Sequence, residues 1–407
     1  MKNSGELSKI VNDHVEIDLV GEWGYYKSWA KDDSQKSGAY IFRPDAPDAE
    51  LQRIEPVPSK IFVVETDLVT EVHLSFEGSW VHQIVKVYKD KAYIDIEYTI
   101  GPIPVDDGIG KEVVHLMRSS ISSNGTFYTD SNGRKFLKRE RSRRQTWNMK
   151  EFEPVAGNYY PVNAAIFIED NSSAMAICTD RTQGGSSLQD GTIELMVHRR
   201  LVKDDSRGVG EILNETSGIL PYPPFGDASR QGDGLIITGM HRILVGKNIT
   251  GARMARTEMD NMFSPTHSFA LKSADTTLFK KKQKLLISET LNELPENVQL
   301  LTLKVIRTEE DGKKVVLLRL GHAYSKEDCK INGVTVQVDI STLFKNYKLV
   351  KLNEKTLTGN QEKDTWNQNK MWWDRKRYPL VGLLPLSIVS LNPMEVKTFE
   401  VIIEPNK

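Results

Sequence analysis

The sequence predicts an all-β protein, and three observations support this class. Residues 94–100 alternate strictly between apolar and polar side chains, as a strand with one buried face does. Many short runs of this kind are separated by Gly, Asn, Asp and Pro, which is typical of stacked β-sheets. Helical patterns are few, since residues 280–292 carry leucines without a clean helical stripe and Pro295 follows them.

Individual elements follow in chain order. Asn132-Gly133 lies between two aromatic-bearing runs and predicts a tight hairpin turn. Residues 301–305 alternate, residues 309–312 (Glu-Glu-Asp-Gly) turn the chain, and a second apolar run follows at 315–320, which predicts another hairpin. Residues 334–340 alternate once more and predict a further strand.

The 407 residues are enough for two or three domains, each with its own core. A boundary is expected between about 248 and 295, where the chain is polar and weakly periodic. The predicted organisation is a leading segment (1–24), a large β-domain (25–290) and a smaller β-sandwich (291–407). No repeat of fixed period appears, which argues against a propeller or solenoid.

Charge and hydropathy exclude several classes. The net charge is −1 and no apolar run approaches the length of a membrane span. The basic run at 134–144 is interpreted as a solvated face rather than a nucleic-acid site. The N-terminal residues lack the apolar core of a secretory signal, so either the protein is cytosolic or this chain starts downstream of the true N-terminus.

Cys178 and Cys329 are expected to be buried free thiols rather than a disulfide. Four sequons would be surface glycosylation points in a secreted chain, although chance alone supplies a few such motifs. Their asparagines are Asn124, Asn171, Asn214 and Asn248.

Common catalytic signatures are missing: there is no nucleophile elbow, zinc helix, P-loop or dinucleotide-binding glycine motif, and the eight histidines never pair at metal-ligand spacing. We therefore assign no catalytic residue and no metal ligand. Asp106-Asp107 and Asp204-Asp205 are paired acids, the residue type that glycoside hydrolysis needs. Because neighbouring residues on a strand point to opposite faces, turns are the favoured interpretation.

Residues 179–188 (TDRTQGGSSL) form a polar, Gly-rich stretch after an apolar strand. As a loop it would offer backbone amides and the Arg181 guanidinium to an oxygen-rich ligand, or it is simply a surface turn; composition leaves both open. Three aromatic pairs could stack on sugar rings, although core packing is their more common role. They are Tyr25-Tyr26, Tyr159-Tyr160 and Trp372-Trp373.

Several long segments in one consistent order resemble the class II α-mannosidases of glycoside hydrolase family 38, specifically the lysosomal type. The resemblance covers the chain from about Tyr25 to its end. The matching runs are 35–44 (QKSGAYIFRP), 101–114 (GPIPVDDGIGKEVV), 127–139 (FYTDSNGRKFLKR), 154–163 (PVAGNYYPVN), 179–215 (from TDRTQGGSSL to GEILNE) and 391–399 (LNPMEVKTF).

The resemblance implies a large β-supersandwich, similar to galactose mutarotase, followed by a smaller terminal β-domain. It implies retaining, zinc-dependent hydrolysis of terminal α-mannosides in the lysosomal degradation of glycoprotein N-glycans. In this family the nucleophile, the acid/base carboxylate and the zinc ligands lie in an N-terminal α/β domain and the helical bundle after it. This chain is therefore expected to be a non-catalytic portion, inactive alone, whose partners are that N-terminal domain and a mannose-containing oligosaccharide.

Two residues carry over from the family as substrate-binding residues: Tyr40, in the SGAY motif, and Arg181, in the TDR motif. Both resemble family residues that reach from the β-domain into the sugar pocket. The simpler alternative is a packed tyrosine and a structural ion pair. Two alternatives to the mannosidase function also stay open: a free-standing carbohydrate-binding β-sandwich protein without hydrolase activity, and a cytosolic interaction module.

Overall fold

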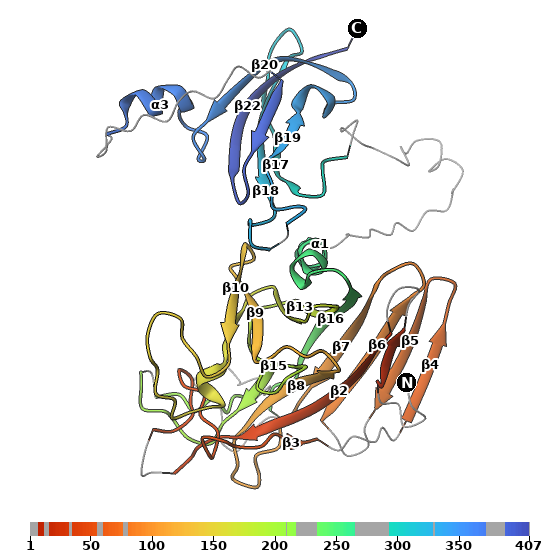
Figure 1. The fold of residues 1–407 in the computed structure, drawn as a ribbon, viewed down its shortest axis with the longest axis vertical. Helices are drawn as coiled ribbons and strands as arrows, with labels where there is room; N and C mark the ends of the chain where they lie inside the picture. Colours follow the sequence, from red (N-terminus) through yellow and green to blue (C-terminus); the bar gives the residue numbers. More distant parts are fainter. Residues whose placement is uncertain are drawn as a thin grey trace, which may run out of the picture. The chain divides into compact units, whose positions relative to one another are not determined.

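The structure, a computed structural model, describes most of the chain in two compact units, Met1–Pro265 and Thr266–Lys407 (Figure 1). Both units are built from antiparallel β-sheets, and the described residues contain two α-helices. The all-β prediction is confirmed. The division expected at 290/291 falls outside the described part and stays a prediction. The described residues are 7–11, 16–31, 35–54, 60–75, 80–208, 210–216, 234–264, 293–328, 330–371 and 387–406.

The first unit packs two sheets face to face. The seven-stranded sheet has the order β1 (Lys9–Val11), β2 (Glu16–Lys27), β8 (Lys111–Ser119), β15 (Thr192–Arg200), β14 (Gln183–Ser186) and β11 (Tyr160–Val162), with β3 (Gln52–Arg53) paired to β2. The nine-stranded sheet has the order β10 (Lys135–Glu140), β9 (Thr126–Ser131), β12 (Ala165–Glu169), β13 (Ser173–Thr179), β16 (Ile237–Lys247), β7 (Tyr93–Ile100), β6 (Val81–Tyr88), β5 (Val69–Ser75) and β4 (Lys60–Glu65).

The core of this unit lies between the two sheets. Leu19 and Met117 from the seven-stranded sheet meet Ile96, Ile166 and Ile177 from the nine-stranded sheet in one buried cluster. Residues two apart on a strand share a face, so each strand contributes alternate apolar side chains to this layer. The strand predicted at residues 94–100 is confirmed as β7, and its apolar positions are buried. The polar face does not lie in water as predicted, because Asp95 is buried and pairs with Arg242.

The Asn-Gly hairpin is also confirmed. Strands β9 and β10 pair in register around it, from Ser131–Lys135 to Thr126–Glu140. Asn132 and Gly133 both have positive φ, 52° and 70°. This is the backbone that a type I′ turn requires at its two central positions, and Asn and Gly adopt it at low cost.

Helix α1 (Gly251–Phe263) was not predicted, because its residues were assigned to a polar, weakly periodic boundary. Thr250 caps it, accepting a hydrogen bond from the Arg253 N–H. The helix lies on β13, β12 and β16 (Figure 1). Its buried stripe consists mainly of small residues and one methionine, so it lacks the large aliphatic side chains that usually reveal an amphipathic helix. The members of this stripe include Gly251, Ala252, Ala255 and Met259.

Cys178 lies beneath α1, fully buried, with its Sγ 3.9 Å from the Ala255 carbonyl oxygen. It is a free thiol, as expected. Cys329 lies outside the described residues. Burial raises the pKa of the Cys178 thiol well above its usual value, because the interior disfavours the thiolate.

The second unit contains a sheet of order β17 (Val298–Thr308), β18 (Lys314–His322), β22 (Val396–Pro405) and β20 (Tyr347–Lys355), with a separate pair of β19 (Val336–Asp339) and β21 (Ile388–Leu391). A short helix, α3 (Lys363–Asn369), follows β20. The predicted β17–β18 hairpin is confirmed. Strand β17 nevertheless departs from the pattern of one buried face, because Leu301, Leu303 and Val305 are all exposed and the core is filled by the other strands.

Neither described helix combines the length and the apolar content that crossing a lipid bilayer would require.

Replacing Met259 with alanine should destabilise the first unit by about 2–5 kcal/mol, because it leaves a cavity between α1 and the sheet. Thr257→Ala, on the exposed side of the same helix, is the matched control and should change stability by about 0.5 kcal/mol or less. Urea unfolding of both variants measures the difference. Equal stabilities would contradict the packing of α1 described above.

Candidate functional site

Buried acids lie on the outer face of the seven-stranded sheet, the face turned away from the sandwich core. Tyr26 pairs with Glu112 across β2 and β8, and Leu116 pairs with Glu194 across β8 and β15. Glu112 and Glu194 are 0% and 3% exposed. Their burial requires a cover, which residues 35–54 and 151–159 supply by packing apolar side chains onto Tyr26. Alternating acids normally mark a solvent face, so no local residue pattern indicates this buried layer.

Glu112 is held by a dense set of charged hydrogen bonds. Arg199 donates Nε to its Oε2 (2.6 Å) and Nη2 to its Oε1 (2.8 Å), and Ser37 Oγ donates to Oε1 (2.6 Å). Arg199 Nη2 also donates to the Ile41 carbonyl oxygen at 3.1 Å. These bonds tie β8 and β15 to the SGAY segment (residues 37–40).

A β-bulge makes this ion pair possible. The register of β15 against β8 shifts between Met196 and His198, so one extra residue lies on β15. Glu194 and Arg199 are an odd number of positions apart and would otherwise point to opposite faces. After the bulge, Arg199 is paired with Glu112 and shares the outer face with Glu194.

Tyr40 is 63% exposed, yet its backbone is fixed. Its N–H donates to Asp205 Oδ2 at 2.8 Å, and Asp205 is buried. Gly38 lies so close to Asp205 that a Cβ on it would be 2.3 Å from the Asp205 Cβ, and Gly208 lies against the Tyr40 ring. The predicted corner at Asp204-Asp205 is confirmed, since Asp205 also accepts the Arg207 N–H at 3.0 Å.

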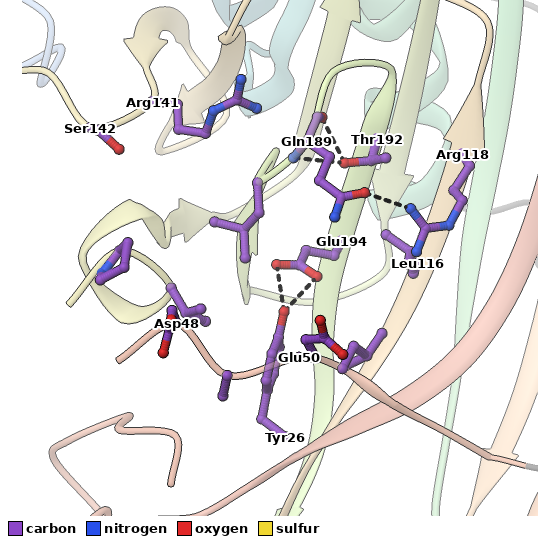
Figure 2. Close-up of a pocket in the computed structure, with 15 residues that line it drawn as sticks. Tyr26, Asp48, Glu50, Leu116, Arg118, Arg141, Ser142, Gln189, Thr192 and Glu194 are labelled. Atoms are coloured by element: carbon purple, nitrogen blue, oxygen red, sulfur yellow. Dashed lines mark hydrogen bonds between the residues drawn. The ribbon is translucent and has the colours of Figure 1, made fainter. Parts of the chain in front are cut away.

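A cavity of about 510 Å³ lies on the same outer face, between the sheet and its cover (Figure 2). Glu194 lies at its centre and accepts the Tyr26 hydroxyl, at 3.2 and 3.3 Å from its two oxygens. Arg118 Nη1 donates to Gln189 Oε1 at 2.9 Å on the other side. Burial raises the pKa of Glu194 to about 7, against the opposing effect of its tyrosine neighbours.

Arg181 lies just after β13 and forms a bidentate pair with Asp180, from Nε to Oδ1 (3.0 Å) and from Nη2 to Oδ2 (2.8 Å). The hydrogen bond from Arg181 to Asp180 raises the pKa of Arg181 further above its usual value. The guanidinium side chain is 48% exposed. It lines a groove of about 780 Å³ along β4 to β7 and β16, whose other members include Phe62, His73 and Glu97.

Tyr40 and Arg181 therefore have separate sets of neighbours in this structure: the Asp205 corner for the first and the groove with Asp180 for the second. Their convergence on one sugar pocket stays a prediction.

The part of the predicted loop that follows residues 180–182 is a strand, which corrects the loop and surface-turn interpretations for this part only. Residues 183–186 form strand β14 between β11 and β15, and Gln183, Ser186 and Ser187 are buried. Gln183 serves the core: its Oε1 accepts from His241 Nε2 at 2.8 Å and its Nε2 donates to the Tyr98 hydroxyl at 2.9 Å.

A stacked histidine pair continues this internal network. His241 Nδ1 lies 2.8 Å from His115 Nδ1, and the two rings are 6° from parallel. Burial lowers the pKa of His241 to about 3 and that of His115 well below its usual value, so both rings are neutral. Since His241 donates to Gln183, His115 must donate to His241, which leaves His115 Nε2 as an unpaired acceptor.

The remaining sequence features have structural roles. Asp107, of the other acid pair, accepts from Lys111 at 2.8 Å and from the Ile109 N–H in a turn. Within the described residues, no group of three or more His, Cys, Asp or Glu side chains could hold a metal ion. In the basic run, Arg139 lies over the Tyr160 ring at 4.2 Å and Arg141 pairs with Asp190 at 3.2 Å.

The aromatic pairs divide. Tyr26 and Tyr159 pack around Phe42, with ring centroids 5.9 and 5.0 Å from it, so these two are core residues between the sheet and its cover. Trp372-Trp373 lies outside the described residues. The four sequon asparagines are all exposed, and their glycosylation stays a prediction; they are Asn124, Asn171, Asn214 and Asn248.

Two family models match this chain. The glycosyl hydrolases family 38 C-terminal domain matches residues 1–207, and the glycosyl hydrolases family 38 C-terminal beta sandwich domain matches residues 297–399. Together they cover most of both structural units.

Curated relatives extend the match along the chain. An α-mannosidase of Canavalia ensiformis is 38% identical over 97% of this chain, and a lysosomal α-mannosidase of Bos taurus is 38% identical over 90%. The chain spans only 40% and 35% of their lengths. Among solved structures, an α-mannosidase from Enterococcus faecalis aligns with 97% of this chain and 42% of its own, with a TM-score of 0.55 and 12% identity, which shows the shared fold.

Glu194→Gln should change how stability depends on pH. With a folded pKa of about 7 against a usual value of 4.5, Glu194 binds more protons in the folded than in the unfolded state between these values. Its contribution to stability is therefore complete below pH 4.5 and is lost as the pH rises through 7, by on the order of 1–3 kcal/mol. Glutamine does not titrate, so the free energy of unfolding of wild type, relative to that of the variant, should fall by this amount from pH 4.5 to pH 8.

Urea unfolding at several pH values measures this difference, and Glu71→Gln, at a less buried acid whose pKa is lowered, should not reproduce it. A pH-independent difference for Glu194→Gln would show that the carboxyl is not desolvated.

Proposed function

This chain belongs to glycosyl hydrolase family 38 as the C-terminal portion of an α-mannosidase, and we propose that it supplies one wall of the mannoside pocket while another part of the enzyme performs the chemistry. The observation that carries this proposal is the family match along a chain that spans only about a third to two fifths of its relatives. The complete enzyme would then hydrolyse terminal α-mannosides with retention.

The residues of this chain do not fit a zinc site, since its described part brings no suitable group of ligands together. Its paired acids form turns rather than two carboxyls that face each other across a substrate. We therefore place the zinc ligands, the nucleophile and the acid/base in an N-terminal α/β domain outside this sequence. That domain is the partner we propose for the β-domains described above.

Arg181 is suited to hold sugar hydroxyls. Asp180 occupies Nε and Nη2, whereas Nη1 donates to no acceptor among the described residues. A guanidinium whose orientation is fixed on one edge can present its remaining N–H groups to a ligand oxygen without losing further side-chain freedom.

Tyr40 is also suited to contact a sugar, because its backbone is fixed while its ring is exposed. Its backbone is anchored by Asp205 and, through Ser37, by Glu112, while its ring stays exposed. The phenol hydroxyl can then donate to or accept from a sugar hydroxyl at low entropic cost. We propose that both residues contact a terminal mannose of a glycoprotein N-glycan, in the lysosome.

The chain alone should be folded but inactive on a chromogenic α-mannoside, with or without added Zn²⁺, because it holds neither a facing carboxylate pair nor a ligand set in its described residues. Circular dichroism confirms the folded state in the same sample. Zinc-dependent turnover by this chain alone would place the catalytic machinery here and reject the proposal.

In the complete enzyme, Arg181→Ala should lower kcat/KM by about 10- to 100-fold, the cost of one charged hydrogen bond, with little change in stability. Tyr40→Phe should have a smaller effect, because it removes one hydroxyl and keeps the ring. Arg143→Ala is the matched control, since Arg143 also pairs with a nearby acid, Glu140, but is more exposed.

Steady-state kinetics on an α-mannoside, with thermal unfolding alongside, separate the outcomes. If Arg181→Ala has wild-type kinetics, or loses activity only because it unfolds, the role assigned to Arg181 is wrong.

A further inference from the structure

The cavity around Glu194 has the features of a built binding site and is separate from the residues assigned above. Its floor is the outer face of β2, β8 and β15, and its walls come from the covering segments at 48–51 and 154–155 and from residues 188–189 (Figure 2). A volume of about 510 Å³ is within the usual range for small-molecule sites. Neither Tyr40 nor Arg181 lines it.

Glu194 has unused acceptor capacity in this cavity. A carboxylate can accept about four hydrogen bonds. The Tyr26 hydroxyl has one proton to share between the two carboxylate oxygens, and both distances, 3.2 and 3.3 Å, are long for an O–H···O bond. The buried Tyr159 hydroxyl also acts on this carboxylate, but it forms no hydrogen bond of normal geometry. A nearly fully buried acid with such weak donors is costly unless a further donor reaches it.

A donor lies beside this acceptor. Gln189 accepts from Arg118 through Oε1, which fixes the amide so that Nε2 lies on the side of Glu194 (Figure 2). That Nε2 donates to no acceptor among the described residues. A hydroxyl group donates and accepts at once, so it can bond to Glu194 and to Gln189 together.

The charges and the walls indicate the class of ligand. Three acids (Asp48, Glu50 and Glu194) and two arginines (Arg118 and Arg141) line the cavity, so a strongly charged ligand of either sign would meet like charges. Apolar side chains complete the lining and suit the C–H face of a sugar ring; they include Leu51, Leu116, Val155 and Leu188.

We propose that this cavity binds a neutral, polyhydroxylated ligand, one residue of a saccharide, with Glu194 and Gln189 bonding to the same hydroxyl. The site is additional to the pocket that Tyr40 and Arg181 are proposed to line. It would hold a second sugar residue or a second glycan branch on the β-domain.

The test uses the 407-residue chain with labelled leucine methyl groups. Methyl α-mannoside, methyl β-glucoside and N-acetylglucosamine are titrated separately, and methyl NMR follows Leu116 and Leu188 in the cavity and Leu320 in the core of the second unit. We expect at least one sugar to shift the cavity methyls saturably, with a Kd of about 1–10 mM, and to leave Leu320 unchanged.

At pH 8, where Glu194 is ionised, Glu194→Gln should weaken that binding by about tenfold or more, because it removes a charged acceptor while keeping the shape. Gln189→Ala, at the exposed rim, tests the same site without changing the buried carboxyl and should weaken binding by about threefold or more. Glu169→Gln is the control: this acid also has a pKa raised by burial, but it bonds to the Gly251 N–H on the other sheet and should bind as wild type does.

Three results would overturn the proposal: no saturable shift with any of the sugars at about 100 mM, well above the weakest affinity expected; equal affinities for wild type, Glu194→Gln and Gln189→Ala; or binding of inorganic phosphate or acetate in place of the sugars. The assay leaves Tyr40 and Arg181 intact and needs no turnover. Its failure is therefore distinguishable from a failure of the mannosidase proposal, which the kinetics of the complete enzyme decide.

Discussion

The arrangement of the outer face depends on one ion pair, between Glu112 and Arg199. Glu112 is completely buried, so its charge is tolerated only because Arg199 grips both of its oxygens and Ser37 adds a third bond. These three residues belong to β8, β15 and the SGAY segment. Removing Arg199 would leave the Glu112 carboxylate buried without its cation, at a cost of about 3–5 kcal/mol. The pair therefore makes the cover over the sheet, and with it the position of Tyr40, part of the folded core.

The two faces of the seven-stranded sheet differ in charge: the inner face carries neutral polar groups and the outer face carries buried acids. The inner face carries His115 and Gln183, which form a neutral hydrogen-bonded chain with His241 of the nine-stranded sheet, and each proton in this chain has a defined place. The outer face carries Glu112, balanced by an arginine, and Glu194, balanced chiefly by tyrosine hydroxyls. Strand alternation keeps these layers apart, and a slip of one residue would move the acids into the apolar core.

Sequence reasoning recovered much of the fold, because strands and hairpins have local causes. Strand β7 is predicted by the period of its apolar side chains, and the Asn-Gly turn by the backbone conformation that these two residues favour. Helix α1 was missed because small residues and one methionine form most of its buried stripe, and no local pattern shows that a sheet lies beneath. Glu112 and Glu194 were missed for a related reason. Polar residues that alternate along a strand predict a solvent-exposed face, whereas here the covering segments bury that face. For Tyr40 and Arg181 the signal was the resemblance of whole motifs, and their burial and partners could not be derived from it.

The buried thiol of Cys178 can report local opening of the first unit. Its thiol is enclosed by β13 and helix α1, and its raised pKa suppresses the reactive thiolate. A thiol reagent can therefore modify it only during excursions that lift α1 or separate β13 from its neighbours. In a chain whose other cysteine, Cys329, has been replaced, the rate of thiol labelling reports how often these openings occur. Binding of a glycan or docking of a partner domain would lower the labelling rate only if it restrains the same strands.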